Sequence, residues 1–282
     1  MTLPSSLKSK FYIDGHFSPI KIFSQEETAQ LFKDYEKYLG KLGTEGDARY
    51  RVHLVTKWAQ GIVTHPVLVS AVKTVLGSNN VLCLQSELCS EPPAGGRDSS
   101  WRQEAANSGL EPSDRVVTAW LALTDSSSSS GSGCLSVISG SQEEQLPHQT
   151  GQGGDKPVIA ESELAHFPAE SRVRMELEAG QVSIHSWRSA VLSPGPNRSK
   201  EDRVGLAITY CTDEVQNMKA VVVRERASLI CGSGGMFWDL ETPPTKDYGA
   251  KELEQQRLSC ERARSNLQSG SEREQENGEE EE

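Results

Sequence analysis

The sequence predicts one mainly β domain with supporting helices, a double-sheet barrel of jelly-roll type. Two amphipathic helical segments come first, and from about residue 81 the pattern changes to short apolar runs separated by turn-rich connections. Hydrophobic residues make up 35% of the chain and five tryptophans are present, which suits a packed core. A length of 282 residues is enough for one large domain of this kind.

The first helix is predicted over FSQEETAQLFKDYEKYLGKLG. Ser24 followed by Glu27 forms a capping box, in which each side chain bonds the backbone N–H of the other residue. Phe32, Tyr35 and Leu39 then recur at helical spacing, and a glycine ends the segment. An amphipathic helix is therefore expected here.

The second helix is predicted over HPVLVSAVKTVLGSNN. Pro66 suits the first helical turn, where a backbone N–H has no partner in any case. Apolar residues occupy positions 68, 69, 72, 75 and 76, and Gly77 suits the C-cap.

Six later segments are predicted strands, because β-branched and apolar residues are concentrated in short runs bounded by turn residues. The six are VLCLQSEL, RVVTAWLALTD, CLSVISG, QVSIHSW, VGLAITYCT and AVVVRER. The low-complexity stretch SSSSSGSG, residues 126–133, lies between two of these strands and is interpreted as a lengthened loop.

The domain is predicted to span residues 1–245, and residues 246–282 are predicted to form an acidic, disordered tail. Apolar periodicity is lost after about residue 245, and residues 251–282 carry ten acids against five bases, a contribution of −5 to the net charge of −11. The stretch KELEQQRLSCERARSNL leaves a short solvated helix as the alternative.

Charge and composition exclude several classes of function. No basic face suits a phosphate backbone, so a nucleic-acid partner is not expected. No apolar run reaches the roughly 18 residues that span a bilayer, so no membrane role is expected. Six cysteines without CxxC spacing indicate free thiols in a reducing compartment, and a cytoplasmic location is predicted. No phosphate loop, hydride-cofactor fingerprint or hydrolase-type nucleophile set is found.

Several blocks, in order, resemble the phytanoyl-CoA dioxygenase family of Fe(II)/2-oxoglutarate oxygenases. They are DGHFSPIKIFSQEE, WRQEAA, TAWLALTD, GCLSVISGSQ, LPH, LEAGQVSIHSW, SPGPNRS and DRVGLAITY, and together they cover roughly residues 10 to 230. The resemblance implies a double-stranded β-helix of the cupin-like type. It also implies one iron, held by a His-x-Asp pair and a distal histidine, with open coordination positions for 2-oxoglutarate and O₂.

The metal triad implied by the family is degenerate in this sequence. Arg102 falls at the first histidine and Glu104 at the aspartate, and counting back from SPGPNRS places Leu192 at the distal histidine. Arginine stays protonated and offers no lone pair, and leucine has no donor atom. A single carboxylate does not hold catalytic iron, so no metal and no catalytic residue are predicted for this chain alone.

The 2-oxoglutarate half of the site is partly kept, by resemblance. Arg203 matches the family arginine that binds the distal carboxylate, and Trp120 matches a residue that lines the same pocket. Pro194 stands where a serine hydroxyl is common, and Glu91 stands where a basic residue is common. A structural ion pair is the competing interpretation of Arg203. His185 is a candidate replacement ligand, but a partly buried structural histidine is the simpler interpretation.

The predicted function is a catalytically inactive oxygenase-like subunit. It would be the non-catalytic partner, in a heterodimer, of an active paralogous dioxygenase that holds Fe(II) and 2-oxoglutarate in an oxidative biosynthetic pathway. It would support that partner's folding, solubility or substrate pocket, and a homodimer is the other assembly considered. Two alternatives stay open. One is a dicarboxylate-binding module that uses Arg203 and Arg102. The other is an active dioxygenase whose iron is bound by Glu104, His185 and a residue donated by a partner.

Overall fold

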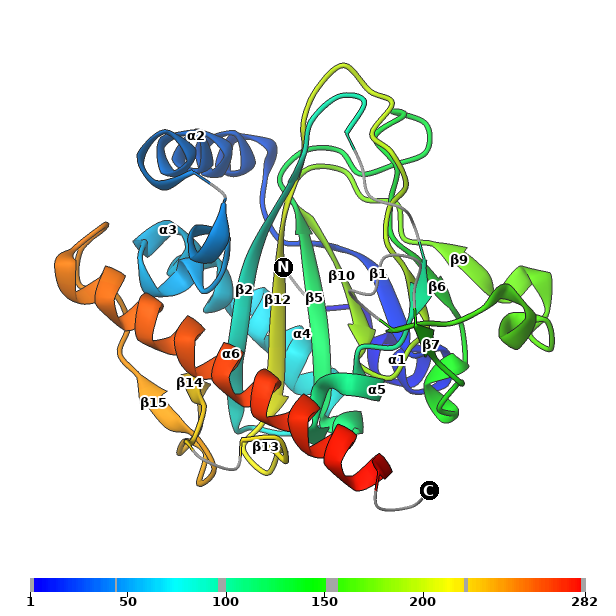
Figure 1. Cartoon of the computed structure of the whole chain (residues 1–282). Helices are drawn as coiled ribbons and strands as arrows, with labels where there is room; N and C mark the ends of the chain where they lie inside the picture. The colour runs from blue at the N-terminus through cyan, green and yellow to red at the C-terminus, as the bar shows by residue number, and fades with distance from the viewer. Residues whose placement is uncertain (1–2, 44, 96–99, 151–156, 221–222, 280–282) are drawn as a thin grey trace.

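The computed structural model describes residues 3–43, 45–95, 100–150, 157–220 and 223–279. Two sheets make up the barrel (Figure 1). The larger sheet has the strand order β1 (His16–Lys21), β10 (Gln181–Ser186), β5 (Val116–Ala122), β12 (Arg203–Thr212), β2 (Val81–Glu91), β14 (Arg226–Cys231), β15 (Asp239–Glu241). The smaller sheet has the order β3 (Trp101–Arg102), β11 (Val191–Leu192), β6 (Ser136–Ile138), β9 (Arg172–Arg174).

Short strand pairs and helices complete the fold. The two-stranded pairs are β13 (Gln216–Asn217) with β4 (Leu110–Glu111), and β7 (Gln149–Thr150) with β8 (Pro157–Val158). The α-helices are α1 (Leu7–Asp14), α2 (Gln25–Leu42), α3 (Lys57–Val63), α4 (Pro66–Leu76), α5 (Ala105–Ser108) and α6 (Ala250–Glu279). Short 3₁₀ turns are η1 (Gly46–Arg49), η2 (Val52–Leu54), η3 (Ser113–Arg115), η4 (Ser141–Glu143), η5 (Glu161–Leu164) and η6 (Ala169–Ser171). The predicted double-stranded β-helix with supporting helices is confirmed.

The main core lies between the larger sheet and the helices α2, α3 and α4. Along β12 the residues Val204, Leu206, Ile208 and Tyr210 all belong to this core, each no more than 1% exposed. Because side chains alternate along a strand, the residues between them point to the opposite face of the sheet. That opposite face is the barrel interior.

Both predicted helices are confirmed, together with their end signals. In α2 the Ser24 Oγ accepts from the Glu27 backbone N–H at 3.2 Å, and the Glu27 carboxylate accepts from the Ser24 N–H at 2.7 Å. Helix α4 begins at Pro66 and ends before Gly77, whose φ of 66° is the left-handed conformation that glycine adopts without strain.

Five of the six predicted strand segments hold strands, and the sixth is displaced. AVVVRER, residues 220–226, was expected to be a strand; residues 221–222 lie outside the described residues, and the strand β14 begins only at Arg226. The strand forms where partner strands are available: β14 pairs with residues Val81 to Cys83 of β2 on one side and with β15 on the other. The Val223 and Arg224 carbonyls instead accept hydrogen bonds from the Asn266 and Arg262 side chains of α6.

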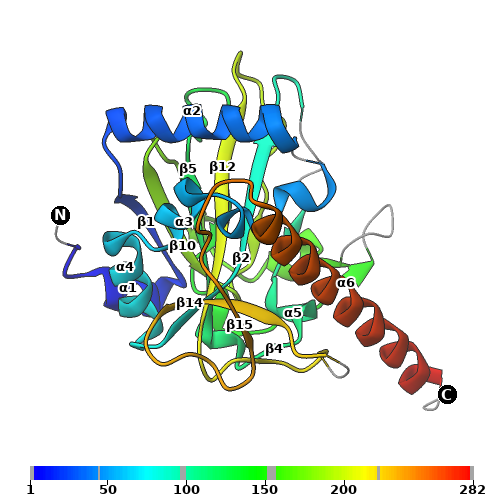
Figure 2. The same cartoon turned by 90° about the vertical axis from the view of Figure 1, so that its left-hand side faces the viewer.

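The C-terminal tail differs from the prediction of disorder, because residues 250–279 form the single helix α6. Its first half docks on the body: the Gln256 amide donates to the Tyr50 carbonyl at 2.6 Å, and Cys260 and Asn266 are buried. Figure 2 shows the helix continuing past the body toward the C-terminus. Residues 280–282 lie outside the described residues.

One segment, Lys57–Leu76, passes a length and hydropathy test for a membrane span. It is not one helix but two, α3 and α4, separated at Thr64 and His65. Leu68, Ala71 and Val72 of this segment are fully buried in the main core. Its apolar character is therefore that of core helices.

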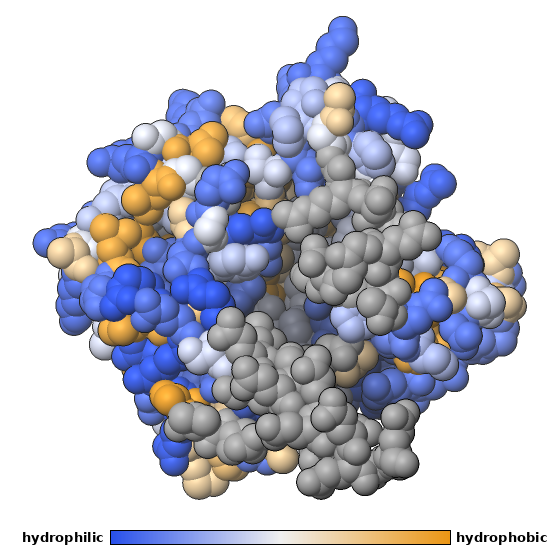
Figure 3. Space-filling view, viewed as in Figure 1, coloured by the Kyte–Doolittle hydropathy of each residue, from blue (hydrophilic) through white to orange (hydrophobic). Residues whose placement is uncertain are grey.

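The surface seen in Figure 3 is mostly hydrophilic, with apolar side chains in separate patches. The most exposed large apolar side chains of the described residues are Tyr12 and Ile13 at the end of α1, and Met218 and Met236. All six cysteines are free thiols.

Candidate functional site

The barrel interior is a polar space that solvent reaches. Thr118 and Trp120 of β5 and Ala207 and Thr209 of β12 point into it, and all four are only half-buried. Central strands of a covered sheet normally bury both faces. Their partial exposure therefore shows that solvent reaches this face of the larger sheet.

Arg102 is the last residue of β3, and its guanidinium takes part in a local hydrogen-bond network. Its Nε donates to the Glu104 carboxylate at 2.5 Å, and its Nη1 donates to the Ser193 hydroxyl at 2.5 Å. The side chains of Arg102 and Glu104 are 26% and 33% exposed. The network thus places an ion pair, open to solvent, at this point of the interior.

Leu192 does not join that network. It pairs with Trp101 across β11 and β3, and residues that face one another across an antiparallel pair share a face. Both pack in a cluster with Ile138, Ile159 and Leu164 on the outer side of the smaller sheet. The residue that the structure brings beside Arg102 is Ser193, one position later than the spacing argument gave.

Arg203 lies at the start of β12 and is 4% exposed. Its Nη1 donates to the carbonyls of Ser132 and Gly195, in the two loops that meet at this end of the barrel. Burial lowers the pKa of Arg203, and Glu91, directly opposite on β2, opposes that shift. The guanidinium therefore links the loops that contain Ser132 and Gly195, and Arg203 lies opposite Glu91 in the sheet.

Trp120 lies on β5, where its cross-strand neighbour on β12 is Ala207. Its indole packs on Gly205, where any Cβ would come within 2.4 Å of the ring. Gly205 is two residues after Arg203 on the same strand, so the Arg203 side chain lies on the face of β12 that the Trp120 ring covers at Gly205. Close packing of the ring on the strand explains why a glycine is needed there.

Comparison with known families decides the identity of the fold. The sequence of residues 32–205 matches the profile of phytanoyl-CoA dioxygenase (PhyH), which is more than half of the chain. The chain belongs to the phytanoyl-CoA dioxygenase family. A search of curated proteins finds no significant match.

Solved structures agree with this PhyH assignment. The apo form of ThoJ, a non-heme monooxygenase, is 26% identical, with 95% of this chain and 99% of that chain covered and a TM-score of 0.82. SnoK, a non-heme α-ketoglutarate-dependent carbocyclase from nogalamycin biosynthesis, is 19% identical, with 76% and 86% covered and a TM-score of 0.65. CytC3, solved with Fe(II) and α-ketoglutarate, is 20% identical, with 88% and 96% covered and a TM-score of 0.63.

The residues at the PhyH metal position do not fit iron. Fe(II) sites of this type need two imidazoles and a carboxylate, and here a guanidinium already bonded to Glu104 and Ser193 stands in their place. Within the part of the chain that the structure describes, no three His, Cys, Asp or Glu side chains converge as a metal site.

His185, the candidate replacement ligand, lies on β10 and points into the interior. It is 5% exposed, and burial lowers its pKa to about 4; Glu104 raises the value, and Arg102 and His16 lower it further. His16 of β1 is its direct cross-strand neighbour. Burial also lowers the pKa of His16, so both imidazoles are neutral at neutral pH.

Sequence reasoning missed the structural roles of Gln103 and His148. The Gln103 side chain donates to the carbonyls of Ser141, Glu144 and Arg188 and accepts from the Leu146 N–H, all at 2.6–3.2 Å. The His148 Nε2 accepts from the Gln103 backbone N–H at 3.1 Å. The signal was present in the quoted blocks WRQE and LPH, where Gln103 lies between the two triad positions Arg102 and Glu104, and where neither Gln103 nor His148 belongs to the triad.

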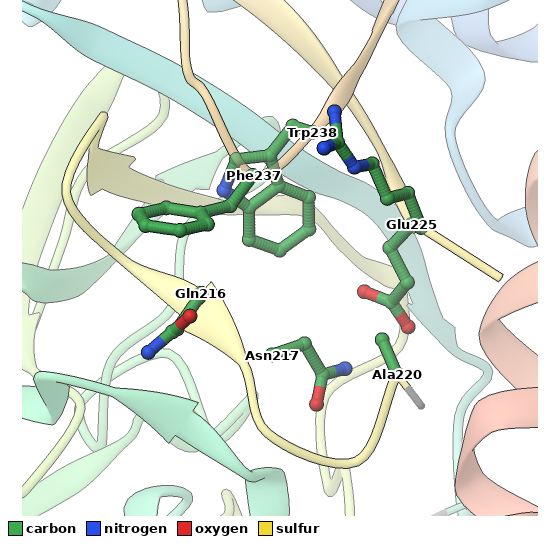
Figure 4. Close-up of a pocket in the computed structure, with 7 residues that line it drawn as sticks. Gln216, Asn217, Ala220, Glu225, Phe237 and Trp238 are labelled. Atoms are coloured by element: carbon green, nitrogen blue, oxygen red, sulfur yellow. The ribbon is translucent and has the colours of Figure 1, made fainter. Parts of the chain in front are cut away.

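Two further cavities open on the surface rather than into the barrel. One of about 190 Å³ lies between the aromatic rings of Phe237 and Trp238 and the polar side chains of Gln216, Asn217 and Glu225 (Figure 4). The other, of about 450 Å³, lies beside the serine-rich loop and is lined by Ser130, Ser132, Lys200 and the acids Asp125, Glu201 and Asp202. Neither contains a catalytic set of side chains.

Proposed function

We propose that this chain is a non-catalytic member of the phytanoyl-CoA dioxygenase family. The observation that supports this proposal best is the hydrogen-bond network of Arg102, Glu104 and Ser193 at the metal position of the family. A guanidinium remains charged at all accessible pH values and offers no lone pair, so it repels a dication at the point where the family places one. Glu104, the one side chain of the three that ligates metals well, is already bonded to that cation.

The same geometry weighs against the two alternative functions. A dicarboxylate would need the free fork of Arg203, but that guanidinium donates to two loop carbonyls and faces Glu91. An iron site built from Glu104 and His185 would need a third ligand, and the described residues supply no group of three. A non-catalytic function requires neither a dicarboxylate site nor an iron site.

We further propose that the chain acts as the partner of an active paralogous dioxygenase in an oxidative, natural-product type pathway. The support is the contrast between a fold that superimposes over nearly the whole of ThoJ and a site that lacks the metal ligands. Structural neighbours include a carbocyclase from nogalamycin biosynthesis. Six free thiols suit a cytoplasmic location.

The test is metal content and 2-oxoglutarate turnover of the purified full chain, measured anaerobically and then in air. We expect no stoichiometric iron and no turnover. Mixed with the active paralogue from the same source, the chain should form a stable complex and raise the turnover of that paralogue. One equivalent of bound iron together with 2-oxoglutarate consumption by this chain alone would refute the proposal.

A matched pair of variants tests the metal position itself. Both carry Arg102→His and Glu104→Asp; one adds Ser193→His and the other adds Leu192→His. Because Ser193 faces Arg102 and Leu192 packs on the outer face, the Ser193→His triple variant should bind iron and the Leu192→His variant should not. Equal iron in both would show that this placement is not the metal position.

A further inference from the structure

The surface cavity of about 190 Å³ beside β13 has an aromatic wall that the core holds in place. Trp238 is 4% exposed, and its indole N–H donates to the Val215 carbonyl at 2.7 Å. Phe237 is partly buried and packs on the same apolar cluster as Trp238. An apolar cavity of roughly 150 Å³ already holds a benzene ring. The space beside these two rings therefore suits one aromatic side chain.

Polar and charged side chains line the rest of the cavity. Figure 4 shows the Glu225 carboxylate and the Asn217 amide across the space from the two aromatic rings. The Arg224 side chain lines the same space. Within the part of the chain that the structure describes, neither the Glu225 carboxylate nor the Arg224 guanidinium has a hydrogen bond or an ion pair. One negative and one positive group are thus available to an occupant.

Three exposed apolar side chains lie next to this cavity along the chain. Met218, Val223 and Met236 are 58%, 42% and 72% exposed, and each is the direct neighbour of a residue that lines the cavity. Apolar side chains that gather on an open surface mark sites of contact with other proteins, and methionine adapts its shape to the partner. A small molecule inside the cavity would leave these side chains in water, whereas a protein segment would cover them.

The charges of the cavity select a neutral aromatic side chain with a hydrogen-bond donor. An acidic side chain would face Glu225, and a basic one would face Arg224. A tyrosine matches both groups, because its ring face attracts a guanidinium and its hydroxyl donates to a carboxylate. Aromatic rings also pack well on one another, and tyrosine is enriched among the residues that dominate protein interfaces.

We propose that this cavity and the apolar side chains beside it bind a segment of a partner protein that inserts a tyrosine. The tyrosine ring packs on Phe237 and Trp238, and its hydroxyl donates to Glu225. Met218 and Met236 contact apolar side chains that flank the tyrosine. This contact goes beyond the proposed function, and it depends neither on the absence of iron nor on the identity of the paralogue.

The test is an NMR titration of the full chain with short capped peptides, each with one leucine on either side of a central residue. The central residue is tyrosine, phenylalanine, glutamate or arginine. We expect the tyrosine peptide to bind saturably and to shift the indole N–H signal of Trp238. The phenylalanine peptide lacks one hydrogen bond and should bind about tenfold more weakly. The glutamate and arginine peptides should bind more weakly than the tyrosine peptide.

Variants at the cavity separate the two kinds of contact. Glu225→Gln removes the charge with little change of shape, so it should weaken binding of the tyrosine peptide and leave the phenylalanine peptide unchanged. Met236→Ser should weaken both peptides equally, because it removes apolar contact outside the cavity. Glu170→Gln, at an exposed position of η6, is the matched control and should bind both peptides as the wild type does.

The tyrosine site is excluded if the tyrosine peptide does not bind, or if Glu225→Gln binds it as the wild type does. Equal affinity for the peptide and for N-acetyl-tyrosine amide would show a small-molecule site to which the neighbouring apolar side chains contribute nothing, and would overturn the proposed contact. Iron loading of the wild type would instead refute the proposed function and leave this contact unaffected, so the two failures are distinguishable.

Discussion

At the residue scale, Arg102 lies between two residues that fix the surrounding structure. The neighbouring Gln103 still fixes the loop 141–146 and the segment after β10 through its buried amide. Trp101, on its other side, still packs on the outer face of the smaller sheet. The local scaffold and the ligand set are thus separable, because alternate residues of a strand face opposite sides.

Gln103 is therefore predicted to be a stability residue. Replacing it with leucine keeps most of the volume but leaves the carbonyls of Ser141, Glu144 and Arg188 and the Leu146 N–H unpaired. We expect a loss of roughly 2–4 kcal/mol in the free energy of unfolding, measured by urea denaturation. Gln145→Leu, at an exposed position of the same loop, is the control. Equal stability of the two variants would contradict this role.

At the scale of elements, the helices were predictable from sequence because their signals are local. The capping box of α2 and the proline and glycine at the ends of α4 act within a few residues. The face of Leu192 was not predictable in the same way, because it depends on the register of β11 against β3, ninety residues apart. Two-residue strands carry too few side chains for alternation to reveal that register.

A short solvated helix was the alternative prediction for this segment, but the docking of helix α6 on the body was not predicted, for a different reason. Its buried face is largely polar, with Glu252, Gln256, Ser259 and Asn266, so hydropathy gave no sign of docking. Three of those side chains bond the body directly: Glu252 accepts from the Thr245 backbone and hydroxyl, Gln256 donates to the Tyr50 carbonyl, and Asn266 donates to the Val223 carbonyl. Burial of polar groups with partners cannot be distinguished from solvation in the sequence alone.

The docking of α6 on the body depends in part on the Gln256 side chain. Gln256→Leu leaves the Tyr50 carbonyl without its donor and should weaken the attachment of the helix by about 1–3 kcal/mol. Faster amide hydrogen exchange over residues 250–266 than in the wild type would report that loss. Arg257→Ala, which removes a side chain from the exposed face of the same helix, should leave exchange nearly unchanged. Faster exchange in the control alone would contradict the docking.

At the scale of the whole molecule, fold class, family and element order follow from the sequence. The exposure and hydrogen-bond partners of the residues inside the barrel do not. The partial exposure of residues in β5 and β12 depends on how the two sheets pack. So does the lack of hydrogen-bond partners for buried atoms of His16, Ser183 and His185. Ser183 was not singled out, and His185 was interpreted as a partly buried structural histidine or a replacement metal ligand. Tertiary packing, rather than residue type, determines which polar groups lack partners.

A second buried histidine lies on the opposite side of the larger sheet, in a closed polar network. The His53 ring contacts the hydroxyls of Ser86 at 2.6 Å and Ser228 at 3.0 Å, and Ser228 donates to Glu241, which pairs with Arg51 at 2.7 Å. Burial lowers the pKa of His53 to about 4, against the raising effect of Glu241. His53 and His185 are thus both held neutral by the folded state.

These two histidines predict acid sensitivity of the whole fold. In the unfolded chain their pKa is about 6.5, so below that pH the unfolded state binds protons that the folded state does not. The free energy of unfolding should therefore be highest above pH 6.5 and fall toward pH 4, by on the order of 3 kcal/mol for each histidine. Urea denaturation between pH 7 and 4.5 measures the slope. His185→Gln, uncharged throughout, should remove about half of the histidine contribution, and a variant that keeps the full slope would exclude His185 as a source.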